Sequence, residues 1–288
     1  MATFTNQAVL SYNGVTTSSN VATGEIVEVL SASKDVLSPE YAAGDTVTYV
    51  INIINSGSTP FTALTVTDNL GAYTHQFADG SERMLYPLTY VDGSVRYYQN
   101  GAEQAVPGVT QTAGLTVSGI GVPAGGNTTL IYQAKTNNFA DPQVGGTITN
   151  TAVISGAEVA APITVRETIT ARSEPYLTIL KSVAPRQVAE NGQITYTFDI
   201  QNLSNTAATA DDNVQITDTF QPVLSNITVT YNGAILPAAS YTYNETTGEF
   251  ATTAGALTVP AAVFTQNDTT GAWSNVPGSA VLTVTGTI

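Results

Sequence analysis

Cysteine is absent from all 288 residues of the chain, which excludes disulfide bonds and thiol chemistry. An extracellular protein without disulfides needs large hydrophobic cores or another covalent staple. His75 is the only histidine, so a histidine-rich metal site is excluded. Phosphate loops, nucleophile elbows and paired-carboxylate motifs are also missing, and we therefore expect no cofactor, no bound metal and no enzymatic turnover.

Charge is scarce as well. Only 10% of the residues are charged, well below the usual quarter, and the formal net charge is −14 with eight lysines and arginines. This balance disfavours nucleic acid or an anionic membrane as partner. No apolar run approaches 18 residues, so no transmembrane helix and no membrane insertion are expected.

The first residues, Met-Ala-Thr-Phe-Thr-Asn, carry neither a basic nor an apolar region of the kind found in secretory signals. Either a leader has been trimmed from the protein, or release follows another route, such as lysis of a mother cell around a spore.

What the chain does contain is alternation of apolar and polar residues with a period of two, punctuated by Gly, Pro, Asn and Ser. No window shows a helical stripe. This pattern predicts an all-β protein of short strands, and 288 residues suffice for two domains. The strands expected in the first half cover residues 3–12, 21–31, 46–55, 64–68, 88–91, 95–99, 128–134, 147–155 and 162–170.

An internal repeat divides the chain. Lys181 follows Lys34 by 147 residues, and Asp218 follows Asp68 by 150. The stretch at 192–202 matches 44–55, 214–218 matches 64–68, and 281–284 matches 129–132. Short strands in this order favour two tandem immunoglobulin-like β-sandwich domains.

The first dozen residues do not follow the repeat order. Residues 3–11 and 147–155 share the pattern T-[FI]-T-N-x-A-V-[LI]-S, in which Asn6 matches Asn150. The copy at 147–155 closes the first domain, whereas the second domain reaches Ile288 without one. We expect residues 1–24 to form a donor hairpin that completes the second domain of a neighbouring subunit. Residues 25–172 would form sandwich domain 1, and residues 173–288 sandwich domain 2, an incomplete acceptor.

Several short motifs recur in one order over the whole chain. In the first repeat they are Lys34, Thr48-Tyr49, Asn55-Ser56-Gly57, Val66-Thr67-Asp68 and Thr149-Asn150-Thr151-Ala152. They resemble a bacterial surface repeat, the conserved repeat domain also called domain of unknown function 11. That family is similar to the sandwich domains of Gram-positive pilins and collagen-binding adhesins. The resemblance implies that a first-strand lysine can be crosslinked to a last-strand asparagine beside an acidic residue. The closing hairpin placed first departs from a plain tandem array.

Two of the three lysines, Lys34 and Lys181, occupy the same place in the two repeats. A buried lysine loses its proton more readily, and the neutral amine can attack an asparagine carboxamide. We expect Lys34 to bond to Asn150 within domain 1, and Lys181 to bond to Asn6 of the next subunit. Asp68 and Asp218 would act as the acids.

A plainer interpretation stays open for each of these residues. The lysines would be solvated strand ends, the aspartates would close turns, and the asparagines would be exposed polar residues on strands. Asp211-Asp212-Asn213 could bind calcium, but a solvated loop is the favoured interpretation. Trp273 with the tyrosines at 86, 90, 97 and 98 could form a glycan platform or simply pack on strands.

The function predicted from these patterns is that of a structural subunit in an extracellular filament on a bacterial cell or spore surface. Its partner is the protein itself, joined head to tail by strand exchange. On the donor strand Phe4, Asn6, Ala8 and Leu10 are expected on one face, with Val9 opposite. The alternative is a monomeric cell-surface adhesin or glycan-binding module.

Overall fold

The computed structural model describes residues 2–288. It is built from strands, with two short 3-10 helices, η1 (Ala210–Asp212) and η2 (Ala238–Ser240). In this range no helix is both long and apolar enough to cross a membrane. The chain divides into two compact units. The first comprises the chain up to Ala140 together with Thr147–Thr170, and the second comprises Asp141–Gly146 and Ala171–Ile288.

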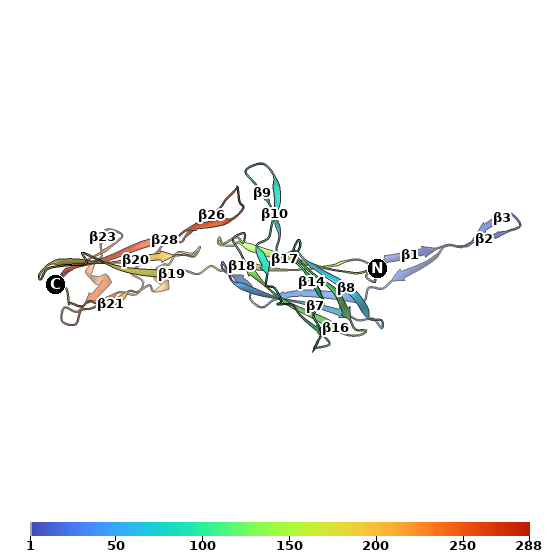
Figure 1. Ribbon diagram of the computed structural model, residues 1–288, viewed down its shortest axis with the longest axis horizontal. Helices are drawn as coiled ribbons and strands as arrows, with labels where there is room; N and C mark the ends of the chain where they lie inside the picture. The colour runs from blue at the N-terminus through green and yellow to red at the C-terminus, as the bar shows by residue number, and fades with distance from the viewer. Residues whose placement is uncertain (1) are drawn as a thin grey trace. The chain divides into compact units, whose positions relative to one another are not determined.

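Unit 1 contains two six-stranded antiparallel sheets (Figure 1). The first sheet has the order β13 (Ala102–Glu103), β12 (Arg96–Gln99), β16 (Asn127–Thr136), β7 (Thr46–Asn55) and β5 (Leu30–Val36), with β11 (Leu88–Tyr90) also paired to β16. The second has the order β14 (Gly108–Thr110), β15 (Leu115–Val122), β8 (Phe61–Asp68), β17 (Thr147–Ser155), β18 (Ile163–Ala171) and β6 (Glu40–Tyr41). A small hairpin joins β9 (Tyr73–Gln76) and β10 (Glu82–Leu85).

Alternation in the sequence places the core of this unit. On β7 the side chains of Val47, Tyr49, Ile51 and Ile53 are buried, while their neighbours are more exposed. Alternate residues of β17 are buried in the same way, at Ile148, Asn150, Ala152 and Ile154. Because a strand turns successive side chains to opposite faces, one face of each sheet packs inward. An asparagine in the middle of an apolar face stands out in this pattern.

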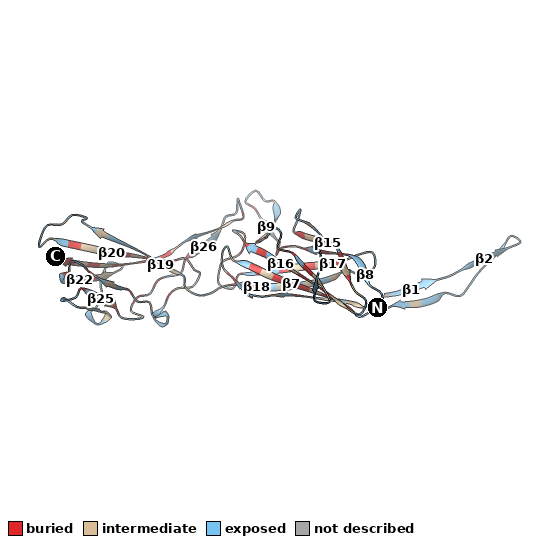
Figure 2. Ribbon diagram, turned by 60° about the horizontal axis from the view of Figure 1, so that its bottom comes forward, coloured by how far each residue is buried: buried red, intermediate tan, exposed pale blue. Residues whose placement is uncertain are grey.

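The N-terminal hairpin is paired only with itself among the described residues. Strand β1 (Ala2–Asn6) pairs with β4 (Ala22–Ile26), and β2 (Val9–Tyr12) pairs with β3 (Val15–Ser18). Figure 2 colours these strands as exposed, in contrast to the alternating buried positions of the sandwich strands. Phe4 is 55% exposed and Leu10 is 62% exposed. Within residues 2–288 the hairpin therefore has no sheet to pack against, and an isolated two-stranded hairpin is only marginally stable.

Unit 2 repeats the first sheet of unit 1 with the order β19 (Leu177–Ala184), β20 (Gln193–Asn202), β28 (Gly278–Thr287), β22 (Ser225–Tyr231) and β23 (Ala234–Ile235). Its second sheet is smaller and comprises β21 (Thr217–Thr219), β25 (Glu249–Thr252) and β24 (Tyr241–Tyr243). A separate hairpin joins β26 (Val263–Gln266) and β27 (Trp273–Val276). The core gathers Phe198, Phe220, Phe250, Leu257 and Leu282.

The two second sheets differ at one edge. In unit 1, β8 pairs on one side with β15, where Asp68 faces Leu115, and on the other with β17, where Asp68 faces Ala152. In unit 2, β21 pairs with β25, where Asp218 faces Phe250, and with no other strand of the described residues. The edge that β17 fills in unit 1 is therefore open in unit 2.

Candidate functional site: a buried lysine–aspartate–asparagine cluster and its exposed counterpart

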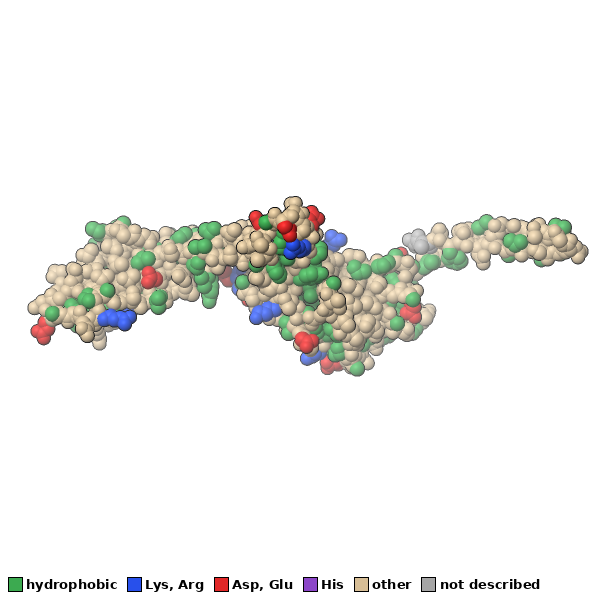
Figure 3. Space-filling view, turned by 45° about the horizontal axis from the view of Figure 1, so that its top comes forward, with side chains coloured by type: hydrophobic (Ala, Val, Ile, Leu, Met, Phe, Trp, Pro, Cys, Tyr) green, Lys and Arg blue, Asp and Glu red, His purple; other side chains and the backbone are tan. Residues whose placement is uncertain are grey.

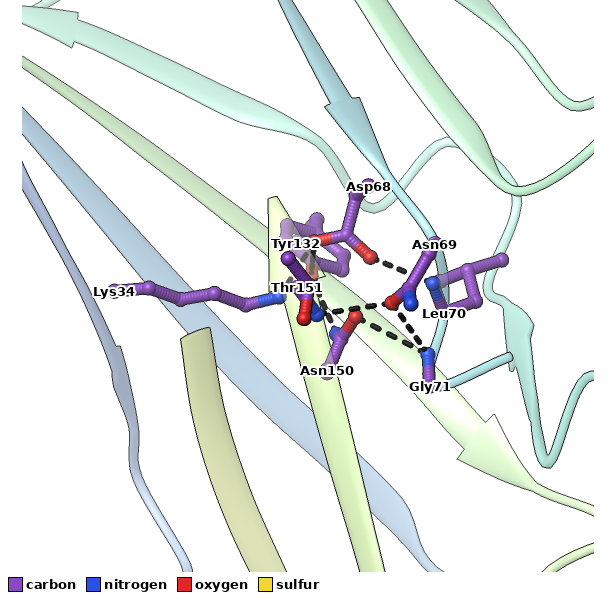
Figure 4. Close-up of polar contacts among 8 residues, drawn as sticks. All are labelled: Lys34, Asp68, Asn69, Leu70, Gly71, Tyr132, Asn150 and Thr151. Atoms are coloured by element: carbon purple, nitrogen blue, oxygen red, sulfur yellow. Dashed lines mark hydrogen bonds and ion pairs between the residues drawn. The ribbon is translucent and has the colours of Figure 1, made fainter. Parts of the chain in front are cut away.

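Three residues predicted from the sequence meet between the two sheets of unit 1 (Figure 4). Lys34 comes from β5 in the first sheet, whereas Asp68 ends β8 and Asn150 lies on β17 in the second. The Lys34 residue is 4% exposed, and Asp68 and Asn150 are both fully buried. The cluster therefore links the first strand of one sheet to the closing strand of the other.

A short chain of hydrogen bonds connects the cluster. Lys34 Nζ lies 2.6 Å from Asp68 Oδ2, and the hydroxyl of Tyr132 on β16 donates to the same oxygen at 2.6 Å. Asn150 Nδ2 donates to the Tyr132 hydroxyl at 2.9 Å. Asp68 and Asn150 are thus connected through Tyr132.

Burial and charge oppose each other at Lys34. Removal from water lowers the pKa of the Lys34 ammonium below its ordinary 10.5, while the charge and hydrogen bond of Asp68 hold it up. The ammonium also lies 4.7 Å from the centroid of the Tyr49 ring. Burial therefore favours the uncharged amine, which is the nucleophilic form of a lysine side chain.

Unit 2 carries the first half of the same arrangement. Lys181 on β19 forms an ion pair with Asp218 on β21, and its Nζ lies 4.7 Å from the centroid of the Tyr196 ring. The side chains of Lys181 and Asp218 are 41% and 18% exposed, against 0% and 1% for Lys34 and Asp68. The exposed pair lies at the edge where a counterpart of β17 would supply the covering asparagine.

Asn6, the predicted partner of Lys181, lies at the end of β1 and faces Ala22 of β4. The predicted donor face of Phe4, Asn6, Ala8 and Leu10 is exposed along its length. Figure 3 shows hydrophobic side chains scattered along this hairpin. The structure of the chain thus brings Lys34, Asp68 and Asn150 together, brings Lys181 and Asp218 together, and leaves Asn6 unpaired with either.

Two contributors to the cluster were not expected from the sequence. Tyr132 bridges Asp68 and Asn150, and the backbone N–H of Gly71 donates to Asn150 Oδ1 at 3.2 Å. Comparing the repeats selects residues that the two halves share, and Tyr132 matches Val284 in the second repeat. No pattern in the sequence marks Tyr132, because the two strands also differ at most of their other positions.

The remaining candidates have structural roles. Asp212 accepts hydrogen bonds from the backbone and hydroxyl of Thr209 and so caps η1. Tyr90 and Tyr97 are 5% and 6% exposed, so they pack in the core of unit 1 and do not form the glycan platform considered above. Within residues 2–288, no group of three or more histidines or acidic residues is arranged to hold a metal ion.

No protein-family model matches the sequence, and no curated protein matches it either. The resemblance to the conserved repeat domain therefore remains without support from a family model.

Among solved structures, the chain is similar to the major pilin subunit of Bacillus cereus, with 10% identity and a TM-score of 0.36 over 73% of this chain and 69% of the pilin. The collagen-binding domain of a Staphylococcus aureus adhesin has 15% identity and a TM-score of 0.30 over 48% of this chain and 96% of the domain. A family 123 glycoside hydrolase from Clostridium perfringens has 11% identity and a TM-score of 0.31 over 50% of this chain, which spans only 27% of that enzyme.

Similarities this distant, from two surface proteins and a hydrolase, carry no argument about activity. The strands and sheets themselves establish an all-β protein with two immunoglobulin-like β-sandwich units. The features that bear on function are the cluster of unit 1, its exposed counterpart in unit 2 and the unpaired hairpin.

Proposed function

We propose that the protein is the structural subunit of an extracellular bacterial filament on a cell or spore surface, in which the hairpin of one subunit completes the second sandwich of the next. One observation carries this proposal: the edge of β21 is open beside an exposed Lys181–Asp218 pair that repeats the buried Lys34–Asp68 pair. An unpaired edge next to a partly covered core is a ready template for a strand from another chain.

The register in unit 1 specifies how the donor would dock. Ala152 and Val153 of β17 face Asp68 and Thr67 of β8. The matching donor residues are Ala8 and Val9, which would therefore face Asp218 and Thr217.

Side-chain burial fits the same register. Ile148, Asn150, Ala152 and Ile154 are the inward residues of β17, and their counterparts are Phe4, Asn6, Ala8 and Leu10. Burying an exposed leucine or phenylalanine side chain stabilises the docked state by about 1.5–3 kcal/mol each. Ile179 of β19, 56% exposed, is part of the surface that the donor would cover.

Donor and acceptor are different surfaces, so the contact is heterologous. Each docked subunit still presents an unused hairpin and an unused edge, and such contacts extend into open filaments unless a rotation closes them into a ring. A hairpin that completed the second sandwich of its own chain would instead give a monomer, which the experiment below distinguishes.

The chemistry of the cluster supports a covalent staple within each subunit. Attack of neutral Lys34 Nζ on Asn150 Cγ would release ammonia and leave an amide that joins the two sheets. Docking of the hairpin would bring Asn6 to Lys181, with Asp218 as the acid, and would exclude water from the pair. The junction would then be kinetically permanent, because an amide is broken far more slowly than a strand dissociates.

Negative-stain electron microscopy tests the proposal. The full chain should form long filaments, and a variant without residues 1–20 should give only separate particles. Adding residues 1–30 after Ile288 through a short linker should complete the second sandwich within the chain and suppress assembly. A full chain that stays monodisperse would favour the adhesin alternative, and filaments from the shortened variant would refute strand exchange.

A further inference from the structure

The hydroxyl of Tyr132 lies between the acid and the carboxamide of the unit 1 cluster. It donates to Asp68 Oδ2 at 2.6 Å and accepts from Asn150 Nδ2 at 2.9 Å. Figure 4 shows the hydroxyl between these two groups, with the Lys34 ammonium approaching the same place. Nδ2 is the atom that must leave as ammonia when a lysine–asparagine bond forms, so Tyr132 touches the leaving group.

The other end of the carboxamide is held by a backbone donor. The N–H of Gly71 donates to Asn150 Oδ1 at 3.2 Å, and the N–H of Leu70 donates to Asp68 Oδ1 at 2.9 Å. Both residues have left-handed backbone conformations, with φ of 51° at Leu70 and 71° at Gly71. A Cβ at Gly71 would lie 2.4 Å from Ile148 Cγ2, so only glycine brings its N–H this close without displacing β17.

We propose that Tyr132 is the catalytic proton carrier for closure of the Lys34–Asn150 bond, with the Gly71 N–H as the donor that stabilises the oxyanion. This inference rests on the isopeptide bond put forward under the proposed function. It adds two groups to the reacting lysine, asparagine and acid. Tyr132 acts at Nδ2 of the carboxamide, and the Gly71 N–H acts at Oδ1.

The proton balance of the step closes within the cluster. Lys34 first gives one proton to Asp68, and the neutral amine attacks Asn150 Cγ to form a tetrahedral adduct whose oxyanion accepts from Gly71. Asp68 passes its proton to the Tyr132 oxygen while Tyr132 passes its own to Nδ2. Asp68 recovers one proton from Nζ, the bond from Cγ to Nδ2 breaks, and ammonia departs. The products are an amide N–H, ammonia and a protonated Asp68, with no net change in charge.

Burial keeps the carrier in the form that the step needs. Removal from water, followed by the negative charge of Asp68, raises the pKa of the Tyr132 phenol well above its ordinary value. The phenol therefore keeps its proton at neutral pH, so it is available to donate that proton as it accepts another from Asp68. Its ring stacks on Tyr49 with centroids 5.5 Å apart, which fixes the hydroxyl in position.

Unit 2 lacks both added groups. Val284 takes the place of Tyr132, since each faces a tyrosine of the neighbouring strand, Tyr196 and Tyr49 respectively. After Asp218 the chain continues Thr219-Phe220-Gln221, without a counterpart of Gly71. Tyr132 thus serves the bond of unit 1 alone, and Asp218 would have to act on Asn6 directly.

Tyr132→Phe tests the inference because it removes one oxygen and keeps the stacked ring. The control is Tyr97→Phe, which removes another buried hydroxyl that hydrogen-bonds to Gly121 in the same unit. Freshly translated full-length protein would be followed by intact mass against time, with thermal unfolding as the measure of folding. General acid–base catalysis contributes about 10²–10⁴-fold, so Tyr132→Phe should lose ammonia at least about 100-fold more slowly, and Tyr97→Phe at the wild-type rate.

A second variant separates proton transfer from packing. A fluorinated tyrosine at position 132 keeps the hydroxyl and the ring but changes the acidity of the phenol, so the rate of ammonia loss should change without a change in thermal unfolding. An unchanged rate in both position 132 variants would overturn the role of Tyr132 while leaving the bond intact. A wild-type protein that never loses ammonia would overturn the bond itself, and the role of Tyr132 with it.

Discussion

Substitutions on the two faces of the donor strand discriminate best, because adjacent residues of this strand are expected to point to opposite faces when it docks. Leu10 matches Ile154, which is fully buried in unit 1, whereas Val9 matches Val153 on the other face of β17. In the free hairpin both are exposed, at 62% and 66%. Leu10→Asp and Val9→Asp should therefore leave the isolated subunit equally stable and differ only in assembly.

The expected size of the difference follows from burial. Leu10→Asp forfeits about 1.5–3 kcal/mol of apolar burial and places a polar group without a partner in the core, at about 2–7 kcal/mol. A combined loss of at least about 3.5 kcal/mol weakens docking about 300-fold or more, because each 1.4 kcal/mol is a factor of ten. Val153 is only half-buried in unit 1, so Val9→Asp keeps its side chain partly in water and should weaken docking much less than Leu10→Asp does.

The assay is the protein concentration at which filaments first sediment, measured for both variants and the wild type at equal ionic strength. Leu10→Asp should raise this concentration at least about 300-fold or abolish assembly, with Val9→Asp close to wild type. Equal behaviour of the two variants would refute the register derived from β17, and normal assembly of Leu10→Asp would refute docking of this face.

Three further predictions concern the clusters. The wild-type subunit should be lighter than its sequence by one ammonia, and Lys34→Ala should restore the full mass. In Asn150→Ala, where no bond can form, the lowered Lys34 pKa means that the unfolded chain binds more protons than the folded one, so stability should rise with pH toward 10.5. Denaturant titrations below pH about 9, where ordinary tyrosines stay protonated, should show this slope, and Lys34→Met in the same background should remove it. Boiled wild-type filaments should give a ladder of multimers on a denaturing gel, which Asn6→Ala or Lys181→Ala should collapse to monomer.

Strict alternation made much of the fold predictable. The strand expected at 46–55 coincides with β7, and the closing hairpin expected at 147–155 and 162–170 lies within a residue of β17 and β18. Strand β15 was not predicted, because Gly119 and Gly121 interrupt the alternation of apolar and polar residues there. The strand expected at 21–31 ends at Ile26, and the lysine-bearing strand β5 begins separately at Leu30.

The site was predictable where both repeats share a residue and unpredictable where they differ. Lys34, Asp68 and Asn150 recur in order, and the two sheets bring them together. Tyr132 has no hydroxyl counterpart in the second repeat, and the Gly71 contact is made by backbone, which leaves no side-chain pattern. The degree of exposure of Lys181 could not be read from the sequence either, because it depends on whether a strand lies along β21.

The central claim, that β1 and β2 of one subunit lie along β21 of another, can be tested directly because the chain has no cysteine. Val153 faces Thr67 in unit 1, which places Val9 opposite Thr217 of the next subunit. Val9→Cys and Thr217→Cys chains, each also carrying Asn6→Ala to remove the proposed amide, would be mixed and oxidised. The account predicts a covalent dimer containing one chain of each kind, lost on reduction, and little dimer when Ser11→Cys replaces Val9→Cys. Failure to form the mixed dimer, or equal yield from Ser11→Cys, would contradict it.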